Sequence, residues 1–177
     1  MVAVEKGGLV GREAEVAEFS AFVANSQAKM VRLAELLTGD RGRAEDLAQH
    51  GFTQAYAAWR RIRTGEPDAY VRRCIVNAHT DWWRRRTWRE QPFALLPEHP
   101  TATDTTATFA TREIVLKALA RLTMRERLVL VFRFYLDMSE LEIANELKIA
   151  PGTVKSAASR GLAKLRCDAE LQAERIA

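Results

Sequence analysis

Polar side chains near the end of the chain carry the donor groups that read DNA bases. Lys155, Ser156, Ser159 and Arg160 point outward from one predicted helix. Such side chains donate hydrogen bonds to base edges in the major groove, and a bidentate arginine on guanine contributes about 1–3 kcal/mol of discrimination. No Asp or Glu occurs between positions 151 and 166, so no carboxylate there repels phosphates. The segment predicts a DNA-binding surface.

A second polar stripe lies in the middle of the chain. Arg73, Asn77, Thr80 and Arg84 recur at i, i+4, i+7 and i+11, which places them on one face of a helix. Arginine holds phosphates, and neighbouring tryptophans could stack on unpaired bases for about 1–3 kcal/mol each. The formal net charge of +4 agrees with a polyanionic partner. The stripe is typical of a surface for nucleic acid.

The aromatic and basic residues beside this stripe have two interpretations. Trp59 and Trp82 follow apolar patterns and are interpreted as core residues. Trp83 and Trp88 suit either a core or a stacking surface. The three arginines at 84–86 suit a helix end, where cations complement the helix dipole, but we interpret them as phosphate-binding.

The rest of the sequence gives no sign of catalytic or metal chemistry. The three histidines are scattered, and Cys74 and Cys167 form no C-x-x-C pair. No phosphate-binding loop, dinucleotide fingerprint or nucleophile elbow occurs. We therefore expect no metal, no cofactor and no enzymatic activity. Because the sequence shows no secretory segment and no apolar run of about 18 residues, we expect no membrane segment and a reducing, cytoplasmic location.

The base-reading side chains belong to a predicted helix-turn-helix. Ser139 and Glu142 have the S-x-x-E spacing of a capping box, which begins the first helix. Pro151 suits the first turn of the second helix, where a missing N–H costs nothing. The inward stripe of the second helix is predicted to be Val154, Ala158, Leu162 and Leu165. The same hairpin could be a simple packing unit, although capping, residue size and charge agree on the first interpretation.

Helical periodicity runs through the rest of the chain, and strand patterns are nearly absent. Helices are predicted over about 12–37, 44–62, 68–86, 114–122 and 124–136, ahead of the helix-turn-helix. Residues 91–108 contain three prolines, five threonines and no Lys or Arg, which is typical of a linker. The predicted fold class is all-α. It comprises a tail (1–11), a first domain (12–90), the linker (91–108) and a second domain (109–177).

Four segments in this order resemble the extracytoplasmic-function sigma factors of bacterial RNA polymerase, of the compact actinobacterial, sigma-E-like kind. They are residues 36–49, 69–77, 122–127 and 152–156. The resemblance covers about 12–166. It implies a region 2-like domain of three to four helices and a region 4-like helix-turn-helix domain, joined by a flexible linker. It also implies an alternative sigma factor that binds core RNA polymerase, recognises promoter DNA and helps melt it to initiate transcription.

The resemblance also assigns residues to partners. The clamp coiled coil of the largest polymerase subunit would be bound by Glu45, Asp46, Leu47 and Gln49. The minus-ten element would be contacted by Thr64, Gly65, Arg73, Asn77, Thr80 and Arg84. The loop at 64–68 would capture a flipped base, and a pocket for the extruded base recovers the few kcal/mol that extrusion costs. The minus-thirty-five element would be contacted by Thr153, Lys155, Ser156, Ser159, Arg160 and Lys164.

Further partners are implied by the same resemblance. The polymerase flap is a second contact on the core enzyme, and the linker would enter the active-site cleft and the RNA exit path. An anti-sigma factor would hide both DNA-binding surfaces. The chain departs from the family pattern at Gly51, Lys148, Ala150 and Ala157, and these departures bear on promoter sequence and affinity rather than on the class.

A second interpretation is a free-standing transcriptional regulator with a LuxR-type helix-turn-helix that binds duplex DNA as a dimer. It leaves the stripe of Arg73, Asn77 and Arg84 without a role, and the sequence lacks a strand-helix receiver pattern. Polymerase dependence separates the two. A regulator binds its duplex alone, whereas a sigma factor of this kind should bind weakly until core polymerase is present.

Overall fold

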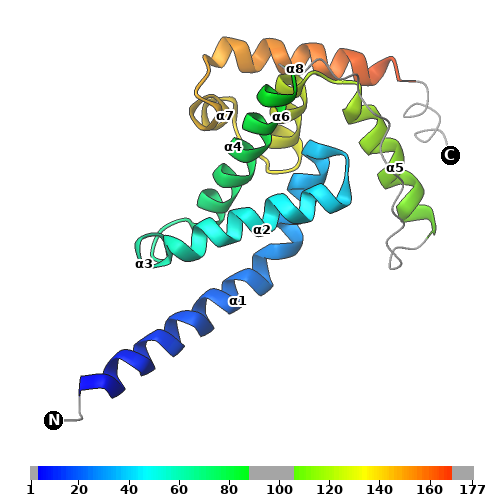
Figure 1. Cartoon of the computed structure of the whole chain (residues 1–177). Helices are drawn as coiled ribbons and strands as arrows, with labels where there is room; N and C mark the ends of the chain where they lie inside the picture. The colour runs from blue at the N-terminus through cyan, green and yellow to red at the C-terminus, as the bar shows by residue number, and fades with distance from the viewer. Residues whose placement is uncertain (1–3, 88–105, 169–177) are drawn as a thin grey trace.

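The computed structural model describes residues 4–87 and 106–168, which form eight helices joined by short connections. The first half consists of α1 (Val4–Thr38), α2 (Arg41–Ala57), α3 (Trp59–Ile62) and α4 (Pro67–Thr87). The second half consists of α5 (Thr106–Ala120), α6 (Met124–Phe134), α7 (Glu140–Leu147) and α8 (Pro151–Arg166). Figure 1 shows the two halves in contact, with the N-terminal part of α1 extending away from the other helices. The expected all-α class is confirmed.

Small residues allow α2 to pack closely against α1 and α4. Ala44 and Ala48 of α2 are buried, as are Val71 and Ile75 of α4. A Cβ atom on Gly51 would lie 3.1 Å from Cγ1 and 3.3 Å from the carbonyl oxygen of Val71. The glycine that departs from the family pattern is therefore explained by the close approach of α2 and α4.

An aromatic cluster attaches α3 to α1. The ring centroid of Trp59 lies 5.1 Å from the centroids of both Phe19 and Phe22, and Trp59 is buried. The interpretation of Trp59 as a core residue is confirmed. The prediction of one helix over 44–62 is wrong, because the backbone leaves helical geometry at Ala58, with φ −102° and ψ 3°. The break gives α3 its own direction.

Two capping boxes begin helices of the second half, and one of them is the predicted box of Ser139 and Glu142. Thr123 accepts a hydrogen bond from the N–H of Glu126, whose carboxylate accepts one from the N–H of Thr123. Ser139 and Glu142 make the same reciprocal pair at the start of α7. Each box satisfies amide donors that a helix start leaves unpaired. These local sequence signals thus fix where α6 and α7 begin.

The inward face of α8 differs from the predicted stripe. Val154 is buried as predicted, but Ala157 and Gly161 are the other buried residues, while the remaining members of the predicted stripe are half-buried. A Cβ atom on Gly161 would lie only 2.9 Å from Cδ1 of Leu130, so the glycine lets α8 approach α6 closely. Ala157 therefore departs from the family pattern at a position that faces the core rather than DNA.

The turn between α7 and α8 contains a strained residue. Lys148 has φ 53° and ψ 47°, the left-handed conformation that glycine adopts without cost. Replacing Lys148 with glycine is expected to raise the free energy of unfolding by about 1 kcal/mol. Lys148→Ala keeps the Cβ atom and should give no gain. Urea denaturation measures both, and equal stability of the two variants would contradict the expectation.

Polar contacts join the two halves. Arg127 of α6 donates from Nη1 to the carbonyl oxygen of Leu37, near the C-terminal end of α1, at 2.7 Å. The buried carboxylate of Glu35 on α1 forms an ion pair with Arg112 of α5. The predicted linker lies outside the described residues except for 106–108, which belong to α5. The sequence left the relative placement of the halves open, and these contacts define it.

Candidate nucleic-acid interface

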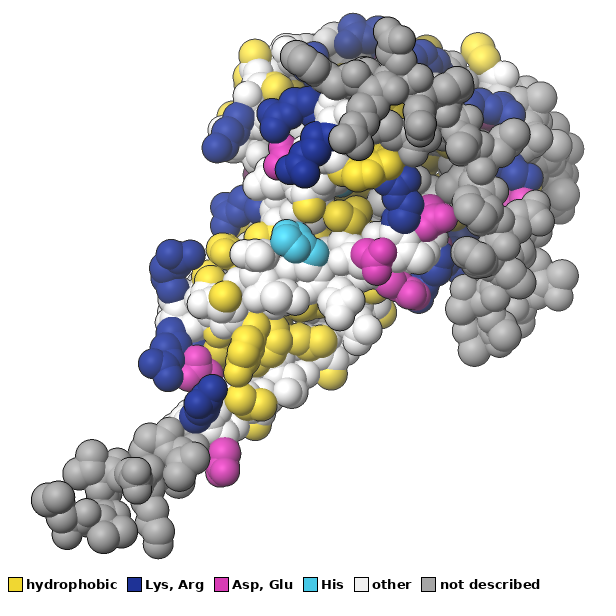
Figure 2. Space-filling view, in the orientation of Figure 1, with side chains coloured by type: hydrophobic (Ala, Val, Ile, Leu, Met, Phe, Trp, Pro, Cys, Tyr) yellow, Lys and Arg dark blue, Asp and Glu magenta, His cyan; other side chains and the backbone are white. Residues whose placement is uncertain are grey.

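Most of the predicted base-reading residues of α8 face solvent. Lys155, Ser159 and Arg160 are exposed. Ser156 is half-buried, and its hydroxyl donates to the carbonyl oxygen of Thr153 at 3.1 Å, so the prediction that it points outward is wrong in part. Figure 2 shows Lys and Arg side chains gathered at the end of the molecule that holds α8. The arrangement keeps three hydrogen-bond donors open to a DNA groove.

A buried carboxylate beneath α8 holds two of its cations. Nζ of Lys164 lies 2.7 Å from Oε2 of Glu126, and Nε of Arg160 lies 3.7 Å from Oε1. Burial raises the pKa of Glu126, but hydrogen bonds from Lys164 and Thr123 outweigh it, and the net result is a lowered pKa. Lys164, predicted as a DNA contact, is thus ion-paired within the protein. Arg160 keeps 60% of its side-chain surface exposed.

The residues of the polar stripe on α4 differ in their exposure to solvent. Arg73 and Asn77 are exposed, whereas Thr80 is half-buried. Arg84 is exposed but forms an ion pair with Asp81 at 3.0 Å. Arg73 and Asn77 are therefore the exposed residues of this stripe that form no ion pair with another described residue. Phosphate binding by the arginines at 84–86 stays a prediction.

Trp82 and Trp83 of α4 are both half-buried. Trp82 is half-buried, and the guanidinium carbon of Arg43 lies 3.5 Å from the centroid of its ring, a cation–π contact. Its assignment to the core is corrected, because a cation from α2 covers the ring. Trp83 is half-buried with its centroid 6.3 Å from that of Trp82, which leaves both of its interpretations open. Trp88 lies outside the described residues.

The loop predicted to capture a flipped base is held on both sides by α1. Thr64 and Gly65 are exposed at its tip. Before them, Arg63 forms an ion pair with a carboxylate of α1 at 3.0 Å. After them, Asp68 accepts a hydrogen bond from the hydroxyl of Ser26 at 2.6 Å. The exposed tip therefore projects from a base that α1 fixes.

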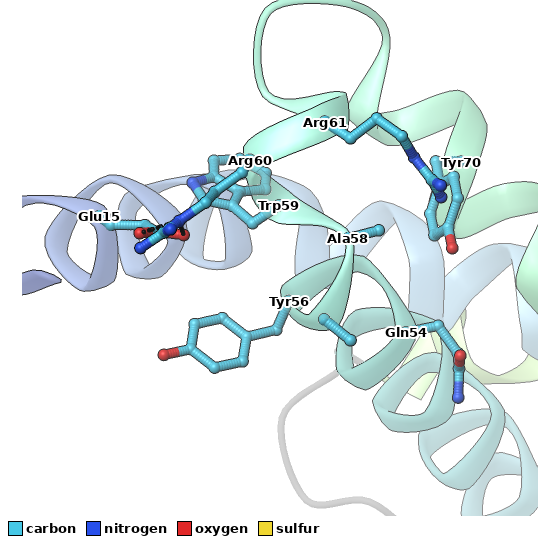
Figure 3. Close-up of a pocket in the computed structure, with 9 residues that line it drawn as sticks. Glu15, Gln54, Tyr56, Ala58, Trp59, Arg60, Arg61 and Tyr70 are labelled. Atoms are coloured by element: carbon cyan, nitrogen blue, oxygen red, sulfur yellow. Dashed lines mark hydrogen bonds and ion pairs between the residues drawn. The ribbon is translucent and has the colours of Figure 1, made fainter.

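A pocket of about 440 Å³ lies beside α3 and the start of α4. Figure 3 shows Arg60 pointing toward Glu15 of α1, where the two side chains pair at 2.9 Å, while Arg61 points toward Tyr70 of α4. A tyrosine ring next to a guanidinium group suits stacking on an unpaired base. Neither Arg61 nor Tyr70 is predicted as a contact from the sequence, because only the packed fold places α3 beside α4.

Two of the residues predicted to bind core polymerase line a groove between α1 and α2. Glu45 and Gln49 stand on the α2 side of this groove, whose volume is about 620 Å³. Its apolar lining is Val23, Ala24, Ala28, Val31, Ala48 and Phe52. Figure 2 shows hydrophobic side chains gathered over α1 and α2. Asp46 is exposed but outside this lining, and Leu47 is half-buried against the core.

Sequence comparisons give the family. Residues 22–89 match Sigma-70 region 2, and residues 112–165 match Sigma-70, region 4. The RNA polymerase sigma-E factor of Streptomyces coelicolor is 39% identical over 153 residues, which cover 86% of each chain. The chain belongs to the sigma-70 family, as an extracytoplasmic-function factor. The sigma-E factor of Streptomyces avermitilis is 37% identical to this sigma factor over 157 residues, 88% of this chain and 87% of that one.

Solved structures share the fold of this sigma factor. The sigma factor RpoE from Bartonella quintana, in complex with the anti-sigma factor NepR, is 20% identical, with a TM-score of 0.67 over 84% of this chain and 94% of that chain. CnrH, in complex with the cytosolic domain of CnrY, is 22% identical, with a TM-score of 0.57 over 84% of both chains. At these identities the likeness concerns the fold alone.

Family membership decides between the two functions considered from the sequence. This protein is an RNA polymerase sigma factor for transcription initiation, and sigma factors are not enzymes. The alternative of a free-standing LuxR-type regulator is overturned, because the first half is a sigma region 2. Within residues 4–87 and 106–168 the sigma factor has no helix long and apolar enough to cross a membrane.

A buried histidine makes the stability of this sigma factor depend on pH. His79 of α4 is 4% exposed. Burial, followed by the positive charges of Arg127 on α6 and Arg43 on α2, lowers the pKa of His79 from 6.5 to about 4. The folded protein therefore binds this proton more weakly than the unfolded chain does. The resulting stability is present above pH 6.5 and is lost as the pH falls toward 4.

As the pH falls from about 7.5 to about 5, we expect the free energy of unfolding to decrease by about 2 kcal/mol, because His79 binds its proton only in the unfolded chain. Urea denaturation at the two pH values measures this loss. His79→Gln cannot titrate and should lose less over the same range. The lowered pKa values of Glu126 and Glu142 act at lower pH than this range. An equal loss in the variant would assign the pH dependence to other groups.

Proposed function

We propose that this alternative sigma factor binds core polymerase, recognises both promoter elements and helps open the duplex through the surfaces described above. One observation carries the proposal: each half presents its own exposed polar face, on α4 in the first and on α8 in the second. A protein that binds a single duplex site needs only the face on α8. Two faces on two domains, proposed at 12–90 and 109–177, suit two separated promoter elements.

The groove between α1 and α2 supports docking on the clamp coiled coil of core polymerase. Helical partners bind grooves that have an apolar floor and a polar rim. Glu45 and Gln49 supply such a rim, and Asp46 adds a carboxylate close by. In the second half, Phe134 and Leu141 are 66% and 63% exposed, and exposed apolar side chains of this size suit a contact with the polymerase flap.

The minus-ten strand is proposed to run along α4. Arg73 would hold its phosphates, and Asn77 would contact a base edge. The loop with Thr64 and Gly65 would capture the flipped base, with Arg61 and Tyr70 of the adjacent pocket available for stacking. Thr80 and Arg84 would extend the contact toward the end of α4.

The minus-thirty-five duplex is proposed to receive α8 in its major groove. Lys155, Ser159 and Arg160 are the exposed donors and would read base edges. The other predicted contacts are half-buried or ion-paired, so they suit the phosphate backbone. They are Thr153, Ser156 and Lys164.

An anti-sigma factor is the proposed regulator of this protein in the cytoplasm. Two proteins of the same fold were solved with partners, RpoE with the anti-sigma factor NepR and CnrH with a cytosolic domain of CnrY. A partner that covers α4 and α8 would block both promoter contacts. The predicted linker, without residues 106–108 of α5, is proposed to enter the active-site cleft of the polymerase, where its acidic character mimics nucleic acid.

Run-off transcription tests the proposed function. Fragmented genomic DNA is transcribed by core polymerase with and without this protein, and the products are sequenced. We expect discrete new start sites that share one two-part motif. An active control sigma factor shows that the core enzyme is competent. No new transcripts in the presence of that control would contradict the proposal.

A further inference from the structure

An arginine next to the minus-ten stripe is bound by the second half of the protein. Arg72 precedes Arg73 on α4, but its side chain is directed to α7. Nε of Arg72 lies 3.4 Å from Oε1 of Glu146, and the two side chains are only 17% and 11% exposed. Sequence patterns give no sign of this pairing, because the partner of Arg72 lies 74 residues away.

The helix that meets Arg72 is acidic. α7 carries Glu140, Glu142 and Glu146 and no Lys or Arg. Hydrogen bonds from Ser139 lower the pKa of Glu142, and the positive charge of Arg72 adds to this lowering. The carboxylate of Glu146 therefore holds Arg72 where a phosphate could bind the same guanidinium group.

We propose that Arg72 is a phosphate-binding residue for the minus-ten strand, and that Glu146 takes the place of the phosphate in the free protein. The inference rests on the proposed minus-ten function of α4. Arg72 projects about 100° away from Arg73 around the helix, so it lies beside the stripe. Its long side chain can turn toward a strand on Arg73 and Asn77 once it is released from Glu146. A phosphate on Arg72 must displace Glu146. Strand binding and the docking of α7 therefore exclude each other at this residue.

The other contacts between the halves leave room for such an exchange. Arg127 is buried, and its Nε has no hydrogen-bond partner among the described residues. Oε2 of the buried Glu35 carboxylate likewise accepts no hydrogen bond within the described chain, although it lies 3.6 Å from Nη1 of Arg32. Buried polar atoms without partners are costly. The halves thus meet through an interface with unsatisfied groups, which a competing phosphate can open more readily than a fully paired one.

Binding of single-stranded DNA by the full chain tests the inference. The probe is a fluorescein-labelled oligonucleotide of mixed sequence, and anisotropy is followed over a series of salt concentrations without polymerase. The proteins are the wild type, Glu146→Gln, Arg72→Gln and the double variant Arg72→Gln/Glu146→Gln. Glu140→Gln is the matched control, because it removes the same charge from an exposed position of the same helix.

We expect Glu146→Gln to bind about threefold more tightly than the wild type. Its plot of log affinity against log salt should be steeper by about 0.7, the value for one added phosphate contact on a single strand. The double variant should lack both changes, because it has no Arg72 to release. Glu140→Gln should leave the slope unchanged.

Two results would overturn the inference while the proposed function stands. One is an unchanged salt slope in Glu146→Gln, and the other is equal tightening in the presence and absence of Arg72. Either would mean that Glu146 acts without freeing a phosphate contact. No strand binding by any of the proteins, either alone or with core polymerase, would instead remove the minus-ten role of α4 itself, and the inference with it.

Discussion

Replacing both Arg73 and Asn77 with alanine is expected to reduce promoter-directed transcription by about a hundredfold, with core binding unchanged. Each side chain is proposed to contribute one contact to the minus-ten strand, and two contacts of about 1.5 kcal/mol multiply to this factor. Both residues are exposed, so the fold should tolerate the change. The groove with Glu45 lies between α1 and α2, away from the replaced side chains. Run-off transcription measures the loss, and gel filtration with core polymerase measures binding.

A matched control separates the loss of the proposed strand contact from the general effect of removing one arginine and one asparagine from the surface. Arg12→Ala/Asn25→Ala removes the same two residue types from exposed positions of α1. It should transcribe like the wild type. If the α4 variant also fails to bind core polymerase, Arg73 and Asn77 support the fold rather than the promoter contact. A transcript level near that of the control would show that the stripe does not touch the strand.

Gly161→Val is expected to destabilise the second half by about 3 kcal/mol. Even a methyl group at this position would meet Cδ1 of Leu130 at 2.9 Å and Cβ of Glu126 at 3.4 Å. The bulkier valine must push α8 away from α6. Because Arg160 and Lys164 are held by Glu126 at the same contact, the variant should also weaken binding to a minus-thirty-five duplex.

Gly152→Ala is the control for the effect of glycine replacement itself. No atom lies within 4 Å of a Cβ at Gly152, although it belongs to the same helix. Alanine there should leave stability unchanged or raise it by up to about 1 kcal/mol. Urea denaturation of the full chain compares the two variants. Similar stability of Gly161→Val and the wild type would show that α8 can move at no cost.

Features that depend on neighbours in sequence were predictable. The boxes at Thr123 and Ser139 and the proline at Pro151 involve residues within one turn, so the residue types alone determine them. The α8 face was predicted less well. Periodicity fixes a broad apolar side, but the exact line of closest packing is set by α6, which fits against Gly161. Ala157 is therefore buried although the predicted inward stripe did not include it.

Features that depend on contacts across the chain were not predictable. Arg72 and Arg127 read as ordinary surface cations in the sequence, yet each meets an acceptor in the other half. The cation–π contact of Arg43 with Trp82 was not predictable for the same reason, because it joins residues of two different helices, α2 and α4. Helical periodicity carries no information about which basic side chain finds a distant partner. The sequence therefore predicts which residues form the candidate site, but not the distant side chains that pair with their neighbours.

The contacts of α1 with the second half also give the protein an order of assembly during translation. Leu37 and Glu35 leave the ribosome long before Arg127 and Arg112, which follow 90 and 77 residues later. Domains generally fold as they emerge, so the first half of a nascent chain forms while these acceptors are still hydrated. Each newly made molecule thus passes through an interval in which α4 is present and α7 is not. A polymerase or an inhibitor that meets the chain in this interval finds the proposed minus-ten helix without the helix that is proposed to compete with the strand.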